Sequence, residues 1–339
     1  MKGLPRWLLW CGLLAFAAGS VHAQSAGVIA RMGFGARGMA VGNALAADAS
    51  GWTSPYYNPA LAPYTTQQHL GLSAALMSRD RQLQFVELGA PLRPRAGIAA
   101  GLIHAGVSKI DQRDNSGYHV GYTSVNEYAF FLAFGLRVHT RASVGVGIQL
   151  FRSDLYPGVA PARSIGFDVG LVLQLMRGLH VGGVVEDLLA RYTWDTSALT
   201  GGTTSDRFPR RFRVGVSWQS QSGQLRLLGE YESQTAQREV LRRSVVLSGF
   251  SAQEVFEAEI LTLHASRLRL GTEYQPVPIL ALRAGLDRLE EVSNGGPRPS
   301  AGFMVEQPLG LLLTRAAYTI VLEPWALGTM HLITIRFFL

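Results

Sequence analysis

Apolar and polar residues alternate along most of the chain after residue 66. In residues 266–274, for example, Leu268 and Leu270 alternate with Arg267 and Arg269. The same alternation occurs in 127–137, 144–152, 164–175, 211–219, 224–232 and 279–288. Successive side chains of a β-strand point to opposite faces, so this period of two predicts strands.

We predict fourteen such strands. They begin near Gln67, Gln82, Arg95, Glu127, Ala142, Ser164, Leu179, Arg211, Gln224, Ser266, Ile279, Ser300, Leu311 and Thr329. Short connections such as 91–94 and 138–141 alternate with longer ones such as 188–210 and 233–265, and only the first connection, 78–81, breaks this order. Short periplasmic turns, long external loops and an even strand number are typical of outer-membrane barrels.

A soluble β-sandwich would show the same alternation with its apolar face turned inward. These segments, however, have the length of about 9–11 residues that a tilted strand needs to cross a bilayer. Several carry aromatic residues near their ends, among them Trp218, Tyr231 and Tyr274, where membrane barrels have aromatic girdles. We therefore predict an all-β transmembrane antiparallel up-and-down barrel over residues 67–339, with apolar side chains facing lipid.

Two segments of this predicted barrel leave alternatives open. The last one, 331–339, is rich in Phe, as is typical of substrates of the barrel-insertion machinery, although it ends on Leu339. The longest connection, 233–265, is apolar around residues 245–247 and 260–261. It could form a hairpin that extends two strands, a lid over the barrel mouth, or two further strands that would make sixteen.

The first 23 residues predict a cleaved signal peptide. Lys2 and Arg6 precede an apolar run over 7–18, and Ala23 ends a cleavage site of small residues. The only cysteine, Cys11, lies in this segment, so the mature chain would have neither disulfides nor thiolate-bound metal. We expect the mature protein in the outer membrane of a bacterial cell, surrounded by outer-membrane lipid.

Composition agrees with a β-rich membrane protein. Apolar residues are 47% of the chain and charged residues 16%, below the charged fraction of about 25% in soluble domains. The formal charge of +7 falls to +5 when Lys2 and Arg6 are removed with the signal peptide. Because the chain has no cluster of Lys and Arg, this excess does not indicate a nucleic-acid partner.

Residues 24–66, before the first predicted strand, are small and almost uncharged. Gly33, Gly35 and Gly38 fit the spacing G-x-G-x-x-G, which binds dinucleotides within a βαβ unit. Here one β segment follows another without helical crossovers, so the dinucleotide hypothesis is weak. We expect this segment to fill the barrel lumen as a plug or hatch.

The sequence of this segment resembles the N-terminal motif of the PorV/PorQ family and, more distantly, of the FadL family. The matching residues are Gly35, Ala36, Arg37, Gly42, Ala44, Asp48, Asn58, Pro59 and Ala60. The stretch between Asp48 and Asn58 is longer than the family pattern, with Trp52 and Ser54-Pro55 inserted. Asn58-Pro59-Ala60 could be a packed structural turn or part of a gating hatch, and the two overlap.

The resemblance implies a fourteen-stranded barrel with an N-terminal hatch and two competing functions. A protein similar to PorV/PorQ would be an accessory of type IX protein secretion, with secreted cargo proteins or other secretion components as partners. A FadL-like protein would pass a fatty acid or another hydrophobic or amphipathic small molecule across the outer membrane. A structural barrel without transport is a third hypothesis.

The sequence predicts no enzyme, metal site or cofactor. No histidine forms an H-E-x-x-H motif, and no serine lies in a G-x-S-x-G motif. Glu186-Asp187 and Glu290-Glu291 are adjacent acidic pairs. Adjacent strand residues point in opposite directions, so neither pair should act jointly as acid and base.

Charged residues on the polar faces of the later strands predict a band inside the lumen. They are Arg211, Arg213, Arg226, Glu230, Arg267, Arg269, Glu273, Arg283, Asp287 and Arg336. One hypothesis is that they pair across strands and stiffen the interior. Because Arg outnumbers acid in this set, the other hypothesis is a site for an anionic head group.

Overall fold

The computed structural model describes residues 32–155, 159–195, 197, 202–248, 251–289, 296–310, 312–323 and 328–339. The predicted signal peptide, residues 24–31 of the predicted hatch and Glu290-Glu291 lie outside these ranges, as do the side chains over 238–258. Nothing in the structure bears on the predicted cleavage after Ala23.

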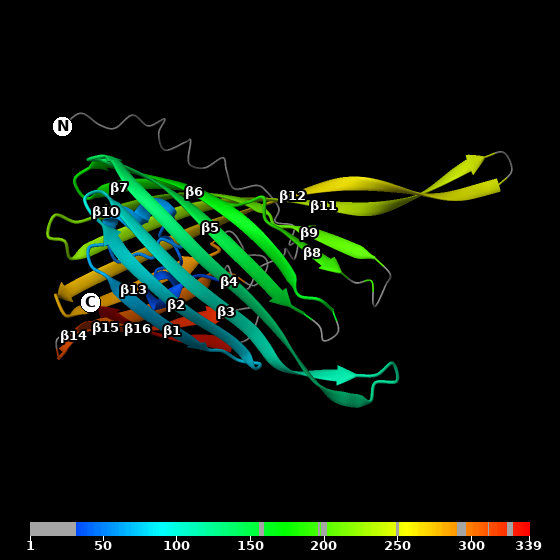
Figure 1. Cartoon of the computed structure of the whole chain (residues 1–339), viewed down its shortest axis with the longest axis horizontal. Coiled ribbons are helices and arrows are strands. Elements are labelled where there is room, and N and C mark those ends of the chain that lie inside the picture. The colour runs from blue at the N-terminus through cyan, green and yellow to red at the C-terminus, as the bar shows by residue number, and fades with distance from the viewer. Residues whose placement is uncertain are drawn as a thin grey trace.

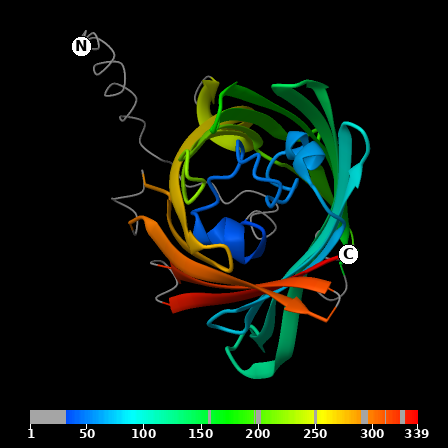
Figure 2. The same ribbon diagram turned by 90° about the vertical axis from the view of Figure 1, so that its left-hand side faces the viewer.

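Fourteen antiparallel strands close into a barrel, which confirms the predicted fold class (Figures 1 and 2). The barrel strands are β1 (His69–Leu76), β2 (Arg81–Leu92), β3 (Ala96–Arg113), β4 (His119–His139), β5 (Ala142–Asp154), β6 (Ala162–Met176), β7 (Leu179–Leu188), β10 (Arg210–Gln219), β11 (Leu225–Ser248), β12 (Ser251–Val277), β13 (Leu280–Asp287), β14 (Arg298–Leu309), β15 (Leu312–Glu323) and β16 (Gly328–Phe338). β1 pairs with β16 from His69↔Phe338 to Leu76↔His331, and this pairing closes the ring. A separate two-stranded sheet, β8 (Arg191–Asp195) and β9 (Thr203–Arg207), lies in the connection between β7 and β10.

The predicted strand starts agree with the structure to within two residues, except for β4 and β12. Both exceptions belong to long hairpins that project from the same end of the barrel (Figure 1). β11 and β12 stay paired from Leu225↔Tyr274 to Ser248↔Ser251. Residues 233–248 and 251–265 therefore extend two barrel strands as a paired hairpin, and the barrel keeps fourteen strands.

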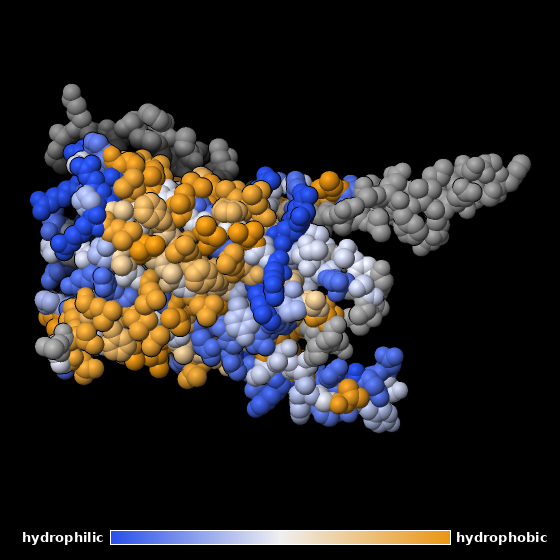
Figure 3. All heavy atoms as spheres, in the orientation of Figure 1, coloured by the Kyte–Doolittle hydropathy of each residue, from blue (hydrophilic) through white to orange (hydrophobic). Residues whose placement is uncertain are grey.

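The outer surface of the barrel carries the apolar faces of the strands. In β5, Val144, Val146, Ile148 and Leu150 are 39–55% exposed, and the residues between them face inward. Figure 3 shows a broad band of apolar residues on the outer surface, with hydrophilic residues toward its ends. Such a band, with closed pairing and no free strand edge, is the arrangement that lipid requires. Among the described residues, no helix is long and apolar enough to cross a bilayer.

Residues 32–66, here called the lumenal segment, lie inside the ring of strands (Figure 2). They contain the short helix α1 (Gly35–Ala40) and the 3-10 helix η3 (Pro59–Tyr64). Wall glycines let this segment approach closely: a Cβ at Gly285 would lie 2.1 Å from the backbone nitrogen of Gly42. The G-x-G-x-x-G spacing here belongs to a buried segment packed in a barrel, and no βαβ unit surrounds it within the described residues.

Candidate functional site

Asn58 anchors the lumenal segment to itself and to the wall. Its side chain is fully buried, and its Oδ1 accepts a hydrogen bond of 3.0 Å from the backbone of Ala60, which caps η3. Its Nδ2 donates to the backbone oxygen of Ala46 at 2.7 Å and to Leu171 on β6 and Gly183 on β7 at 3.3 Å. An amide side chain supplies the donor and the acceptor at once, and Pro59 fits the first helical position. These hydrogen bonds and the position of Pro59 explain why Asn58-Pro59 forms a packed turn.

Arg37 and Asp48, which match the family motif, tie the lumenal segment to the charged part of the wall. Arg37 Nη1 lies 2.7 Å from Asp48 Oδ2, and Arg37 Nε lies 3.0 Å from Glu273 Oε2 on β12. Arg226 Nε on β11 lies 3.5 Å from Asp48 Oδ1. Burial opposes ionisation of the Asp48 carboxyl, but the neighbouring arginines hold its pKa at about 2.

Strands β7, β10 and β11 carry one half of a buried ion-pair network. Arg213 Nη2 lies 2.6 Å from Glu186 Oε1, and Arg213 Nη1 lies 3.3 Å from Glu230 Oε1. Arg211 Nε lies 2.8 Å from Asp187 Oδ2. All five side chains are buried, so each charge depends on its partner to offset lost hydration.

Strand β12 continues this network toward the projecting hairpins. Arg269 contacts three carboxylates: Glu230 at 2.6 Å, Glu232 at 2.7 Å and Asp287 at 2.9 Å. Arg298 on β14 lies 4.0 Å from Asp287, so the network passes on to the next strands.

From Arg298 the network reaches the opposite side of the barrel through Glu323, which lies 3.7 Å from Arg298 and 2.6 Å from Arg81 on β2. On β16, Arg336 Nη2 lies 2.9 Å from Glu87 Oε2. Arg283 on β13 joins Glu273 at 2.6 Å. Ion pairs therefore run around much of the inner wall.

Each residue of the predicted charge band takes part in at least one ion pair of 4.0 Å or less. The excess of arginine in the predicted band is offset by five acids that were not expected in it but pair with its arginines. These are Asp48, Glu87, Glu186, Asp187 and Glu232. The inward position of Glu232 could have been predicted, since Glu232 lies two residues after Glu230 and therefore on the same strand face.

The expectation that Glu186 and Asp187 point in opposite directions is wrong. Both side chains are buried and both contact Arg211, at 3.4 Å and 2.8 Å. The strand period fails here because β7 is irregular: Asp187 has a φ of 60°, and the β6–β7 register shifts between Phe167 and Val169.

The inner face of β2 to β5 carries an apolar cluster, here called the apolar wall, beside the buried polar residues Glu87 on β2 and Gln149 on β5. Phe85, Ile103 and Phe131 are each at most 4% exposed and face the lumen. Phe34 of the lumenal segment packs against Phe85 and Phe131, with ring centroids 5.0 Å and 5.4 Å apart. Tyr56 also packs against Phe131, at 5.6 Å. This cluster was not predicted from the sequence. The feature that could have indicated it is the run FFLAFGL at 130–136, which is apolar on both strand faces.

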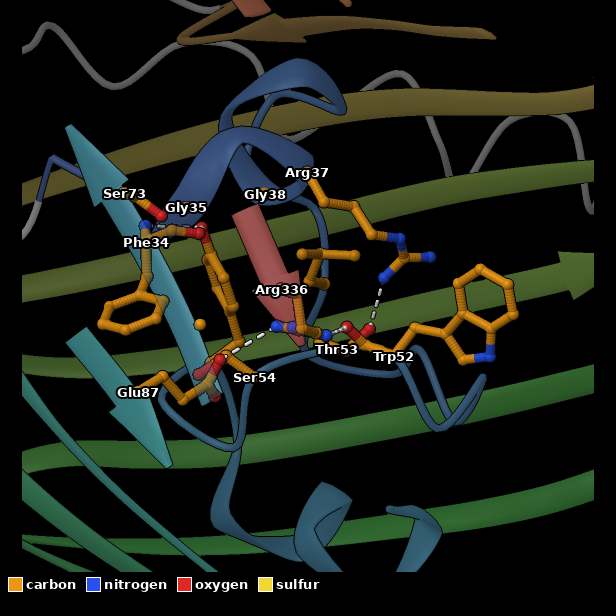
Figure 4. A pocket seen from close by; sticks show the side chains of 13 residues that line it. Phe34, Gly35, Arg37, Gly38, Trp52, Thr53, Ser54, Ser73, Glu87 and Arg336 are labelled. Atoms are coloured by element: carbon orange, nitrogen blue, oxygen red, sulfur yellow. Dashed lines mark hydrogen bonds and ion pairs between the residues drawn. The ribbon is translucent and has the colours of Figure 1, made fainter. Parts of the chain in front are cut away.

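A small cavity lies between the lumenal segment and strands β1, β2 and β16 (Figure 4). Arg336 spans it, donating from Nη1 to the backbone oxygen of Trp52 at 2.8 Å and from Nη2 to Glu87 Oε2 at 2.9 Å. The cavity volume is about 30 Å³, enough for a water molecule or two. At this level the lumenal segment occupies the space that a ligand would need.

Among the described residues, no group of three or more His, Cys, Asp and Glu side chains is placed to hold a metal ion. His69 lies against Glu87, with 3.8 Å between Nε2 and Oε2. His104 is bonded to Gln84 and Asn126 on the outer face of the barrel. The candidate site is therefore the lumen itself, with one apolar wall, one charged wall and a segment packed between them.

No protein-family model and no curated protein matches the sequence. Solved structures do match the fold. They include the toluene transporter TbuX of Ralstonia pickettii (TM-score 0.57, 14% identity, 90% of this chain and 97% of that chain). A FadL homologue of Pseudomonas aeruginosa has a TM-score of 0.56 at 12% identity, over 90% of this chain and 98% of that chain. The toluene transporter TodX of Pseudomonas putida has a TM-score of 0.55 at 13% identity, over 90% and 96%. The fold is that of FadL-like outer-membrane barrels.

Proposed function

We propose that the protein is a passive channel of the bacterial outer membrane for small, hydrophobic, uncharged molecules. Its FadL-like fold supports a transport role, because the structural neighbours TbuX and TodX are described as toluene transporters. The apolar band on the outer surface supports placement in a bilayer. Monoaromatic hydrocarbons are the substrate class that we consider first.

The observation that carries this proposal is the division of the lumen into two walls. Phe85 and Phe131, with Phe34 of the lumenal segment, form an aromatic surface that suits an apolar ring. The arginines of the opposite wall are already bound to carboxylates, for example Arg269 to Glu230. Taking a buried arginine from its partner is costly, so an anionic head group would compete poorly for it. An uncharged substrate needs no such exchange.

Transport would require the lumenal segment to shift. The described cavity of about 30 Å³ is far smaller than the about 150 Å³ that accommodates a benzene molecule in a protein interior. The segment is held to the wall by hydrogen bonds and ion pairs, such as Arg37 to Glu273, with no covalent link among the described contacts. We therefore assign it the role of a hatch that moves to admit substrate.

A reversible lock tests this proposal. A Cβ at Gly215 would lie 3.3 Å from Cβ of Ala46, close to the Cβ separation of about 3.8 Å in a disulfide. The variant A46C/G215C should therefore join the lumenal segment to β10. In intact cells that express it, uptake of ring-labelled toluene should fall to background when the pair is oxidised and recover on reduction.

The matched control is the pair G166C/A190C, which has the same 3.3 Å separation but joins β6 to the connection after β7. Its oxidation should leave uptake unchanged. Equal uptake by the oxidised and reduced A46C/G215C variant would contradict a moving hatch. No toluene uptake above that of cells without the protein would contradict the channel itself.

The second hypothesis, an accessory role in type IX protein secretion, stays a prediction from the N-terminal motif. None of the structural neighbours named above is described as a secretion component. No described feature of the lumen favours a protein cargo over a small molecule.

A further inference from the structure

The outer face of strands β2 to β6 changes from apolar to polar within two residues. One row of register partners across these strands is apolar and exposed: Val86, Leu102, Phe130, Leu150 and Ile165. The next outward row, on the side of the projecting hairpins, is Gln84, His104, Tyr128, Arg152 and Arg163. Figure 3 shows hydrophilic residues beside the apolar band at this end. The step marks where the lipid face of the barrel ends.

Two arginines face each other directly in this polar row. Arg152 on β5 and Arg163 on β6 are register partners, and both side chains are exposed. Side chains at such positions have Cβ atoms about 4.5–5.5 Å apart, and like charges there destabilise the sheet. Arg152 Nε bonds to Asp154 Oδ1 at 3.2 Å, whereas no described carboxylate lies within 4.0 Å of Arg163. With Asp154 as the acid bonded to Arg152, the pair Arg152 and Arg163 leaves an excess of one positive charge directly beyond Leu150 and Ile165.

We propose that Arg152 and Arg163 bind the phosphate of an anionic lipid in the outer leaflet of the membrane. The inference rests on the outer-membrane placement given under Proposed function, with the long hairpins outside. Acyl chains would lie along Leu150 and Ile165, while the phosphate meets the guanidinium groups. Guanidinium binds phosphate through paired, charge-assisted hydrogen bonds. An anion between Arg152 and Arg163 removes the repulsion that their register would otherwise cause.

The polar row beside these arginines fits a membrane interface. His104 Nδ1 lies 2.8 Å from Gln84 Oε1, and the His104 ring stacks on Tyr128 with centroids 4.7 Å apart. Tyrosine prefers the level of the lipid head groups because its ring is apolar and its hydroxyl polar. The arginines continue this row on β5 and β6, which places them at the level where lipid phosphates lie.

Native mass spectrometry of the full mature protein in detergent tests the proposal, with diphosphoryl lipid A as the probe. We expect R152Q/R163Q to lower affinity for this lipid about tenfold or more, because two charge-assisted contacts are lost. The control R141Q/R177Q removes two exposed arginines from the turns at the opposite end and should change affinity less than about twofold. A heat-modifiable gel shift checks that each variant is folded, and R163Q alone serves if the double variant is not.

Equal lipid affinity of the wild type and R152Q/R163Q would overturn the proposal. So would inorganic phosphate binding as tightly as the lipid, since the arginines would then form a site for a free anion. The lipid assay needs no transported substrate, so a failed toluene assay and a failed lipid assay are separate results. Toluene uptake by R152Q/R163Q should equal that of the wild type.

Discussion

The inner wall of the barrel differs between its two sides, although the outer face carries an apolar band on both. On β2 to β5 the inward side chains include Phe85, Ile103 and Phe131, which form an apolar surface. On β7 and β10 to β13 they include Arg213 and Arg269, held in ion pairs. Lipid imposes the same apolar outer face on every strand, but it places no demand on the inner face. The inner face is therefore where a barrel of this fold can be specialised.

The lumenal segment matches this division. Phe34 and Tyr56 contact the apolar side through aromatic packing. Arg37 and Asp48 contact the charged side through Glu273 and Arg226. The segment therefore has one preferred orientation in the lumen, and its position is set by both walls together.

The largest effect should come from breaking the charged wall. In the variant R269M, Glu230, Glu232 and Asp287 each lose their shortest ion pair. They keep only contacts of 3.3–4.0 Å with other arginines, and removing one partner of a buried ion pair is strongly destabilising. We expect the free energy of unfolding to fall by about 3–5 kcal/mol. Urea unfolding in lipid vesicles, followed by tryptophan fluorescence, measures this change.

The control for R269M is R210M, because Arg210 is exposed on a strand of the same wall. Its unfolding free energy should change by less than about 0.5 kcal/mol. An equal loss of unfolding free energy in R269M and R210M would mean that the inner ion pairs do not stabilise the barrel more than an exposed arginine does.

A smaller effect should follow when the lumenal segment is pushed from the wall. In G285L the new Cβ would lie 2.1 Å from the Gly42 nitrogen and 2.4 Å from the Val41 carbonyl carbon. We expect a loss of about 1–3 kcal/mol from overpacking, together with higher conductance in planar bilayers because the segment cannot close the lumen. The control G229L adds the same side chain on the outer face, where the nearest atom is 3.8 Å away on Leu270. Unchanged conductance in G285L would contradict closure by this segment.

A substitution in the apolar wall should reduce the uptake of toluene more than it reduces the free energy of unfolding. F131L keeps most of the buried volume but removes a ring that packs against Phe34 and Tyr56. Aromatic pairs contribute about 0.5–1.5 kcal/mol, so we expect uptake of labelled toluene to fall about two- to tenfold. F130L, on the adjacent residue that faces outward, should match the wild type. A larger loss in F130L than in F131L would place the substrate path outside the lumen.

The smallest effect concerns pH. Asp48 has a pKa lowered to about 2 by Arg37 and Arg226 against the effect of burial, whereas an unfolded aspartate titrates at about 3.9. A lowered folded-state pKa gives stability that is present above about pH 4 and lost as the pH falls toward 2. Conductance should therefore be constant from pH 8 to 5 and rise only below about pH 4. The variant D48N should show no such rise, and opening between pH 7 and 5 would exclude Asp48 as the group responsible.

Much of the barrel could be predicted from the sequence because side chains that face lipid are apolar, and they occur at every second position of a strand. Val144, Val146 and Ile148 repeat every second residue, and such repeats located most strand starts. The starts of β4 and β12 were missed because their outer parts, such as residues 251–265 of β12, project beyond the barrel. Those parts are free of the lipid constraint and lack the clean alternation.

The candidate site was less predictable because its pairing depends on registers that join distant strands. Arg213 and Arg269 were both expected in the lumen, but their acid partners Glu186 and Glu232 were not. Phe131 was missed for another reason: a strand that is apolar on both faces gives no sign of which ring faces inward. The N-terminal motif located Arg37 and Asn58 in sequence, while their contacts with β12, β6 and β7 required the folded barrel.

The most direct measurement compares the entry of toluene and benzoate, which share a ring and differ in charge. Both are ring-labelled and supplied to intact cells with or without the full-length protein, and uptake is measured by rapid filtration. We expect the protein to raise the rate of toluene entry and to leave benzoate entry at the background of cells without it. Benzoate entry raised as much as toluene entry, and lost in R226Q, would contradict a lumen built for uncharged molecules.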